Sequence, residues 1–276
     1  MRVIDVRHKG REKVIGCWEV DGVLIDPGPS ITADTLLSAL DGAQPRALLL
    51  THIHFDHAGA TGTLVERWPD IPVYVHERGA PHMVNPEKLV ASAGRLYGGE
   101  SGLRELWGEL VPVPEGNLRV LRGGETVEGA FRVEYTPGHA SHHVAYFHAP
   151  SRTAFVGDVG GARIPPHDFT VAPTPPPDID VAAWKASIAK IRGWEPQTIA
   201  MTHFGDAGPD QLDKVLEALD AQVALAAEHD EDGFVAAMDE RIRAGVEEDA
   251  DAMIQATPLD QLHMGLERWR TKLKVG

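Results

Sequence analysis

Residues 47–59 read ALLLTHIHFDHAG, an apolar run that leads directly into three histidines and one aspartate within six positions. These four polar residues are His52, His54, Asp56 and His57. A loop at the end of a buried strand can turn several side chains toward one point, and imidazole nitrogen and carboxylate oxygen suit zinc and related first-row ions. Without an ion, the adjacent rings would need other partners or exposure to solvent. The stretch therefore predicts a metal site at the end of a strand.

Three further polar residues follow β-like runs elsewhere in the chain, each with a glycine within two positions. They are His139 in EYTPGHASHH, Asp158 in AFVGDVG and His203 in IAMTHFGD. Glycine allows backbone and side chains to crowd around an ion. Together with the first cluster, these residues supply enough ligands for two ions that share a bridging carboxylate and a bridging water. Because a water between two divalent ions loses a proton near neutral pH, the pattern predicts hydrolysis without a protein nucleophile.

The sequence around these clusters alternates strands and helices. Val14 to Val20 and Val23 to Ile25, separated by Asp21-Gly22, are typical of a β-hairpin. Helical spacing predicts helices over 32–40, 58–68 and 181–192, the last capped by Asp178 or Asp180. Strand patterns occur at 47–50, 72–76, 118–121, 131–135, 144–147, 153–156 and 198–201. The chain is thus expected to have two β-rich halves with helices between the strands.

Three segments show less regular patterns. Residues 77–116 are rich in glycine, proline and charge, and we expect an insertion that borders the metal site. The proline-rich stretch over 165–178 is either an ordered lid or a linker. Residues 207–276 have apolar residues at helical spacing and predict a helical C-terminal segment. We expect all of these segments to belong to a single domain over 1–276.

The composition argues against several classes of protein. A formal charge of -15, from 26 basic and 41 acidic residues, disfavours binding to nucleic acid or to an anionic membrane. No apolar run reaches the roughly 18 to 20 residues of a membrane span, and the opening residues lack the apolar stretch of a signal peptide. A cytoplasmic location and a small-molecule substrate are therefore expected, and a homodimer is compatible with the sequence. The single cysteine, Cys17, predicts neither a disulfide nor thiol chemistry.

The spacing of His52, His54, Asp56 and His57 is the HxHxDH motif of the metallo-beta-lactamase superfamily, which the chain resembles over most of its length. The resemblance implies an α/β (α+β) fold, the αββα sandwich, with metal ions at one edge of two sheets. It implies that one ion is held by His52, His54 and His139, that the other is held by Asp56, His57 and His203, and that Asp158 bridges them. The expected cofactors are two divalent ions, zinc in the first place, with iron or manganese as alternatives.

The resemblance also suggests roles for two aspartates. Asp56 is expected to orient the hydroxide and to carry a proton to the leaving group, in addition to its role as a ligand. Asp26, in LIDPG, matches a strand-end aspartate that supports the ligand loop from behind. A turn-forming aspartate before proline is an equal alternative for Asp26.

Other polar residues near these motifs have simpler interpretations. His142 and His143 are adjacent, so in a following strand their side chains would point oppositely, as supporting or surface groups rather than ligands. His167, in the proline-rich stretch, is a candidate substrate contact. Four cations near the C-terminus fit a favourable interaction with the dipole of the last helix better than recognition of an anionic substrate. These cations are Arg268, Arg270, Lys272 and Lys274.

The substrate class is predicted by excluding other members of the superfamily. Asp158 stands where the best-known zinc β-lactamases carry cysteine, and the chain has no room for the nuclease insertion of the RNA-processing members. What remains resembles the compact glyoxalase II and lactonase group, which cleaves thioesters, lactones and similar carboxylic esters. The alternatives are a mononuclear non-haem iron persulfide dioxygenase, a phosphodiesterase of the same fold, and a metal-bearing binding protein without turnover. The complete second set of ligands favours hydrolysis.

Overall fold

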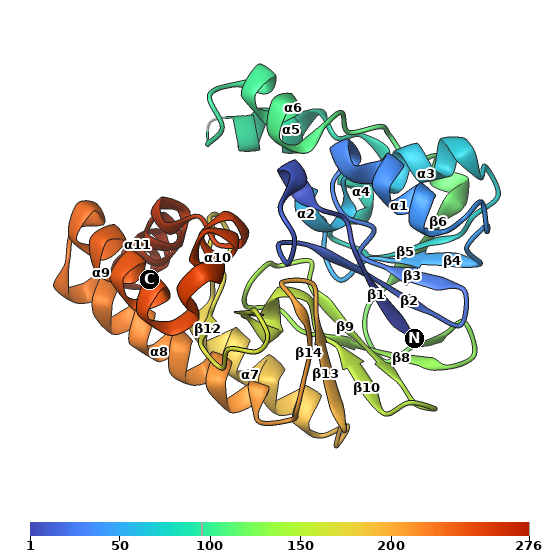
Figure 1. Cartoon of the computed structure of the whole chain (residues 1–276). Helices are drawn as coiled ribbons and strands as arrows, with labels where there is room; N and C mark the ends of the chain where they lie inside the picture. The colour runs from blue at the N-terminus through green and yellow to red at the C-terminus, as the bar shows by residue number, and fades with distance from the viewer. Residues whose placement is uncertain (95, 276) are drawn as a thin grey trace.

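The computed structural model describes residues 1–94 and 96–275, in which two β-sheets pack face to face between outer layers of helices (Figure 1). The first sheet contains, in spatial order, β1 (Arg2–Asp5), β2 (Gly16–Val20), β3 (Val23–Ile25), β4 (Ala47–Leu49), β5 (Val73–His76) and β6 (Leu118–Leu121). The second contains β14 (Gly205–Ala207), β13 (Thr198–Met201), β10 (Thr153–Phe155), β9 (Val144–His148), β8 (Phe131–Tyr135) and β7 (Thr126–Val127). The short strands β11 (Ala162–Arg163) and β12 (Thr170–Val171) pair separately.

The helices form the outer layers and the C-terminal segment. Figure 1 shows α1 (Ala33–Ala39), α3 (Thr61–Arg67) and α4 (Ala80–Val84) along the first sheet, and α7 (Val181–Arg192) and α8 (Gln211–Glu228) along the second. Beyond α8 lie α9 (Glu231–Val246), α10 (Ala250–Ala256) and α11 (Leu259–Val275), while α5 (Glu87–Gly94) and α6 (Glu100–Trp107) project from the first sheet's side. The predicted αββα sandwich with a helical C-terminal segment is confirmed.

The apolar run before the HxHxDH motif is buried on both sides. Successive side chains of a strand point to opposite faces. Leu49 accordingly packs into the core between the two sheets with Tyr146, whereas Leu48 packs into the core beneath the outer helices. A strand covered on both faces reads as continuous apolar sequence, as this one does. The burial of β4 holds the beginning of the following loop in place.

Most of the predicted elements are confirmed, and the differences have physical reasons. Val20 pairs with Val23 across a turn in which Asp21 (φ 50°) and Gly22 (φ 78°) are left-handed, as the Asp-Gly hairpin requires. Asp180, rather than Asp178, caps α7, because its Oδ1 accepts a hydrogen bond of 2.9 Å from the Ala183 amide.

The predicted helix over 58–68 was wrong at its start. Helical structure begins at Phe55 with α2 (Phe55–Ala58), and α3 follows after a break. The second half of the motif therefore lies in a single helical turn, which is too short to show an apolar period. The strands β7, β11, β12 and β14 were not predicted, since two or three residues are too few to show a period of two.

The described helices are not of the kind that spans a membrane. Within residues 1–94 and 96–275, none has both the length and the apolar character that a membrane crossing requires.

Candidate metal centre

The predicted ligands come together because four chain segments end at one edge of the sandwich. In the second sheet β10 and β13 run parallel and β9 runs antiparallel to β10, so the start of β9 and the ends of β10 and β13 share an edge. The loop after β4 reaches the same place, since Val144 at the start of β9 donates its amide to the Thr51 carbonyl at 2.8 Å. Every predicted ligand lies in one of these four loops or in the helical turn that begins there.

The first group of ligand atoms consists of three ring nitrogens and one carboxylate oxygen, from His52, His54, His139 and Asp158. Nδ1 of His54 lies 3.0 Å from Nε2 of His52 and 3.0 Å from Nε2 of His139. Tetrahedral ligands about 2.0–2.1 Å from a zinc ion would be roughly 3.3 Å apart, so the three nitrogens are spaced as ligands of one ion. Oδ2 of Asp158 completes the group, 3.4 Å from Nε2 of His139.

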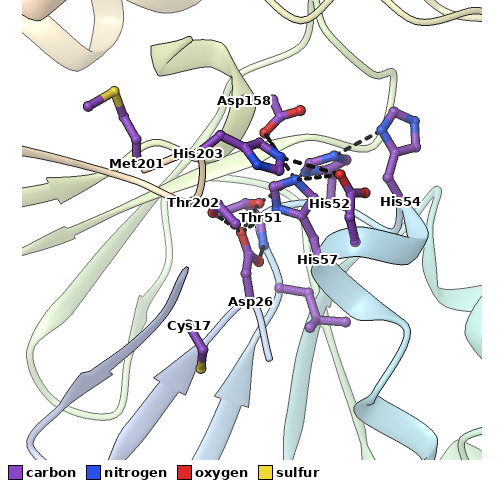
Figure 2. Close-up of polar contacts among 12 residues, drawn as sticks. Cys17, Asp26, Thr51, His52, His54, His57, Asp158, Met201, Thr202 and His203 are labelled. Carbon is purple, nitrogen blue, oxygen red and sulfur yellow. Dashed lines mark hydrogen bonds and ion pairs between the residues drawn. The ribbon is translucent and has the colours of Figure 1, made fainter. Parts of the chain in front are cut away.

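The second group consists of Asp56, His57 and His203. Figure 2 shows His57 and His203 with Asp158 beside them. Nε2 of His203 lies 3.3 Å from Oδ2 of Asp56, and Nε2 of His57 lies 3.8 Å from the same oxygen. Oδ1 of Asp158 reaches this group as well, at 3.0 Å from His57 Nε2 and 3.6 Å from His203 Nε2. The two oxygens of Asp158 therefore face different groups, the arrangement that a bridging carboxylate needs.

Hydrogen bonds behind the site fix which ring nitrogen carries a proton. Nδ1 of His57 donates to Oδ2 of Asp26 at 2.8 Å, and Nδ1 of His203 donates to the Val14 carbonyl at 2.6 Å. Nδ1 of His139 donates to the Pro173 carbonyl at 2.8 Å. Each Nε2 is thus left with a lone pair directed at the centre of its group.

Buried atoms without partners show that the site suits cations. Among the described residues, Nε2 of His57, Nε2 of His203 and Oδ1 of Asp158 are buried and make no hydrogen bond. Buried polar atoms are rarely left in this state. Lone pairs and carboxylate oxygens converge here without a donor between them, so the donor set fits divalent metal ions.

Asp26 supports the centre from behind, and its left-handed backbone (φ 51°) also turns the chain before Pro27. It is fully buried, and its Oδ1 accepts from the Thr51 amide at 2.8 Å. Its Oδ2 accepts from the hydroxyls of Thr51 at 2.6 Å and Thr202 at 3.0 Å, in addition to His57. Asp26 therefore ties together the two Thr-His pairs that follow β4 and β13 (Figure 2). Sequence reasoning missed both threonines, although the repeated Thr-His dipeptide after a strand was a usable signal.

Two glycines are needed for the chain to pass this closely. Gly138, directly before His139, has φ 139°, and a Cβ there would lie 2.3 Å from the Trp184 Cα. Gly157, directly before Asp158, has φ 47°, and a Cβ there would lie 2.6 Å from Oγ1 of Thr51. Both positions exclude a side chain, which confirms the expectation that glycine lets the segments crowd around the site.

A cavity of about 540 Å³ opens onto the metal centre. Its base is formed by His54, Asp56 and Asp158. Its walls come from α5, from the chain between α5 and α6, from prolines of the 165–178 stretch, and from α10 and α11. Prominent wall residues are Leu89, Tyr97, Trp107, Pro175, Leu262 and Met264. The 77–116 segment, which was expected to border the site, and the proline-rich stretch, for which a lid and a linker were the alternatives, both line the space in front of the ligands.

The family model for the metallo-beta-lactamase superfamily matches residues 19–203. This span contains every predicted ligand and both sheets, apart from β1, most of β2, and β14. The chain belongs to the metallo-beta-lactamase superfamily. With its His/Asp metal site it is a metal-dependent hydrolase of that superfamily.

Two curated relatives and two solved structures illustrate the similarity. The probable metallo-hydrolase YflN of Bacillus subtilis is 29% identical over 66% of the chain and 74% of its own length. A hydroxyacylglutathione hydrolase of Pectobacterium atrosepticum is 33% identical over 49% of the chain, but this match spans only 41% of that enzyme.

Among solved structures, ST1585 from Sulfolobus tokodaii, described as an archaeal metallo-beta-lactamase superfamily protein, has a TM-score of 0.69 and 24% identity, with coverage of 92% of this chain and 93% of its own. TTHA1623 in a di-iron-bound form has a TM-score of 0.56 and 30% identity, with coverage of 74% and 92%. The first supports the fold, including the helical C-terminal segment, and the second was solved with two iron ions bound.

Protons are expected to compete differently for the two groups in this superfamily site. Burial lowers the pKa of His52 and His139 and brings that of His54 to about 4, so these rings stay neutral well below pH 7. Burial alone would also lower the pKa of His57 and His203, but the negative charge of Asp158 raises both. In the metal-free protein the rings of the second group therefore bind protons more readily than those of the first group, and an ion must compete with these protons.

The affinity of the site for a metal ion that displaces protons falls as the pH falls. On dialysis from pH 8 to about pH 5.5, we expect one metal equivalent, held by His52, His54 and His139, to remain while the second is lost. Elemental analysis after each step measures this. Loss of both metal equivalents over the same pH range would contradict the assignment. So would ligand variants showing that the equivalent lost first is the one held by His52, His54 and His139.

The remaining candidate residues lie at different distances from the site. His143 is buried with Nδ1 2.9 Å from Oγ1 of Thr136, whereas His142 borders the cavity, and both rings stack on that of His52. Both residues precede β9, so the strand that was expected to point them oppositely does not include them. Among the described residues, neither belongs to a group of possible ligands, as expected. His167 does not border the cavity, and its ring faces Asp249 at 3.5 Å. The suggested substrate contact is therefore wrong for His167.

The four C-terminal cations lie in different surroundings, and the helix-dipole interpretation fits only two of them. Lys272 and Lys274 lie in the last turn of α11, as that interpretation requires. Arg268, in contrast, borders the cavity and donates from Nε to the Pro177 carbonyl at 3.2 Å. Arg270 turns away to the Ala226 carbonyl and to Glu267. Of the four, Arg268 alone is placed to meet a substrate within the cavity.

His8, which sequence reasoning passed over, ties the cavity wall to the body of the domain. Its ring stacks on Trp107 at 4.8 Å with an interplanar angle of 3°, and its Nε2 donates to the Leu106 carbonyl at 2.8 Å. The Gln255 side chain in α10 donates to the His8 carbonyl at 2.9 Å. The N-terminal loop thereby joins α6 to α10 on two sides of the cavity.

Proposed function

We propose that this chain is a dinuclear hydrolase of small-molecule thioesters, lactones or similar carboxylic esters whose acyl or leaving group has a sizeable apolar part. The observation that carries the proposal is the placement of Asp158, whose Oδ2 faces His139 at 3.4 Å and whose Oδ1 faces His57 at 3.0 Å. A single-ion enzyme would need only one of these groups. The pair supports zinc as the first candidate, with iron and manganese as alternatives.

When bound, two divalent ions supply an acidified water and an electrophile for the substrate carbonyl. The chain's own residues then have distinct tasks. Asp26 holds His57 in the tautomer that leaves Nε2 free, and the Val14 carbonyl does the same for His203. Asp158 fixes the distance between the two groups. These contacts keep the donor atoms in place before substrate arrives.

Asp56 is the proposed proton carrier. It borders the cavity, unlike the fully buried His57 beside it. Burial raises the pKa of Asp56, but the nearby rings of His57 and His203 outweigh this and hold it below its usual range. The carboxylate is therefore ionised at neutral pH, so it accepts a proton from the attacking water before it passes one to the leaving group.

The apolar part of the substrate is proposed from the cavity walls. Leu89, Tyr97, Trp107 and Leu262 present largely apolar surface near the metal centre. Burying apolar substrate atoms there is favourable by about 25 cal/mol per Å². A volume of about 540 Å³ exceeds what an acetyl group would fill.

A substrate panel with matched metal analysis tests the proposal. Purified protein loaded with two equivalents of zinc, iron or manganese is assayed on acyl thioesters, lactones, aryl esters, phosphodiesters and persulfides, with oxygen uptake recorded. We expect hydrolysis of thioesters or other carboxylic esters without oxygen consumption. Persulfide-dependent oxygen uptake would replace the proposal with a dioxygenase, and phosphodiester cleavage alone would replace it with a phosphodiesterase. Silence on the whole panel with both metals loaded would favour a binding protein.

The cavity assignment predicts a change in acyl-chain preference when its wall is filled. Ala93 on α5 borders the cavity, so Ala93→Leu is expected to lower kcat/KM for octanoyl thioesters by about tenfold or more, since an added group in an apolar pocket is worth roughly 1–3 kcal/mol. Acetyl thioesters should be cleaved nearly as before. Steady-state kinetics over a series of chain lengths measures the effect.

The matched control lies on the same helix. Ala91 borders the hollow behind α5 rather than the cavity, so Ala91→Leu should leave the chain-length profile unchanged. Equal effects of the two variants would show that the cavity does not hold the acyl chain.

A further inference from the structure

His142 stands beside the metal centre without belonging to it. It lies in the loop that leads into β9, and its ring borders the same cavity as His54 and Asp56. Within residues 1–94 and 96–275, it belongs to neither group of possible ligands. Its ring stacks on that of His52, with a centroid distance of 6.1 Å and an interplanar angle of 13°. It stands edge-on to the ring of His54, with a centroid distance of 5.8 Å and an interplanar angle of 89°. His142 is thus a polar group close to the first ligand group with no task in holding an ion.

A backbone contact sets the tautomer of this ring. The Ile53 amide donates a hydrogen bond to Nδ1 of His142 at 3.4 Å. Because Nδ1 accepts, the proton of the neutral ring is on Nε2. A ring whose Nδ1 accepts a hydrogen bond carries only this one proton and is neutral. Nε2 makes no hydrogen bond to any residue that the structure describes, and it is not among the atoms shut off from the cavity and solvent.

The backbone on both sides of His142 is held in place. The Tyr135 hydroxyl donates to the Ser141 carbonyl at 2.9 Å on one side. On the other side the Val144 amide donates to the Thr51 carbonyl at 2.8 Å. A donor fixed in this way loses little freedom when it binds a substrate atom, which is the condition for effective electrostatic stabilisation.

We infer that His142 is a catalytic residue that donates a hydrogen bond from Nε2–H to the substrate carbonyl oxygen as negative charge develops on it. The inference rests on the proposed ester hydrolysis. The proton stays on Nε2, so the ring keeps its charge throughout the reaction. Because the oxygen carries more negative charge in the transition state than in the bound ester, the hydrogen bond lowers the barrier more than it tightens binding. The effect therefore falls on kcat more than on KM.

Three substitutions separate this role from a structural one. His142→Asn retains an acceptor for the Ile53 amide but places no donor at the position of Nε2, and His142→Phe retains the ring but has neither group. Both are expected to lower kcat by about 10²–10³-fold with little change in KM, the usual effect of losing one such donor. His142→Gln can place its amide nitrogen near the position of Nε2, so it should recover most of the lost kcat. The reaction is assayed on the ester or thioester that the panel identifies.

Controls and outcomes are defined by metal content and by the wild-type enzyme. Each variant is checked for two metal equivalents and for an unchanged thermal unfolding midpoint, and His229→Phe, at an exposed position, serves as the matched histidine control. If the wild-type protein cleaves no ester, the proposed function itself fails. If the wild type is active, wild-type kcat in His142→Asn and His142→Phe overturns the inference. So does a loss of kcat that is equal in all three variants or that accompanies loss of a metal equivalent.

Discussion

Asp158→Ala is expected to abolish hydrolysis while leaving a folded protein. The substitution removes the carboxylate whose Oδ2 lies 3.4 Å from His139 and whose Oδ1 lies 3.0 Å from His57. Charge stabilisation by metal ions is worth several kcal/mol and each 1.4 kcal/mol is about tenfold, so we expect kcat/KM to fall by about three orders of magnitude or more. Elemental analysis should show less than two equivalents of metal, and circular dichroism should show unchanged secondary structure.

The conservative variant and a surface control sharpen this prediction. Asp158→Asn preserves shape but removes the negative charge that two cations share, so its loss should approach that of alanine. Asp70→Asn, at an exposed position in the turn after α3, should behave like wild type. Full activity in Asp158→Ala with two metals still bound would show that the carboxylate does not bridge the groups.

Asp26→Asn is expected to have the second-largest effect, although Asp26 is not a proposed ligand. Its carboxylate accepts hydrogen bonds from the Thr51 amide at 2.8 Å, from the hydroxyls of Thr51 and Thr202, and from His57 at 2.8 Å. An amide side chain presents one oxygen instead of two and turns an NH₂ group toward these donors. Partners of metal-bound histidines typically contribute about 10–100-fold to metal affinity or activity, and we expect a loss of that size.

Metal titration and thermal unfolding distinguish the two parts of this effect. The metal-free variant should unfold more easily, because buried donors are left without acceptors at a cost of about 1–3 kcal/mol each. The affinity for the second ion, which involves His57, should weaken more than that for the first. Unchanged affinity and stability would mean that the Asp26 contacts do not support the centre.

The ligands could be predicted from sequence because each follows a strand that the apolar pattern also predicts. The run before His52 is apolar because β4 is buried on both faces, and the same signal precedes Asp158 and His203. Gly138 and Gly157 added information, since a Cβ at either position would collide with the neighbouring chain. The local sequence pattern was therefore sufficient to predict the ligands that follow the ends of strands.

The rest of the site could not be predicted because it depends on distant segments meeting. The Pro173 and Val14 carbonyls orient His139 and His203, and a backbone carbonyl has no sequence signature. The cavity wall combines Tyr97 with Gln261 through a hydrogen bond of 3.2 Å across a large separation in sequence. Similarly, α2 was missed because a four-residue helix is too short to show an apolar stripe.

Stepwise metal reconstitution of the metal-free protein tests the central claim most directly. Zinc is added in fractions of an equivalent, and the rate on the best ester or thioester from the panel is recorded together with bound metal and oxygen uptake. The dinuclear assignment, with Asp158 between the two groups, predicts that hydrolysis rises to its plateau as the second equivalent binds and that no oxygen is consumed. Full turnover at one equivalent, turnover without metal, or activity that appears only with one iron and consumes oxygen would contradict it.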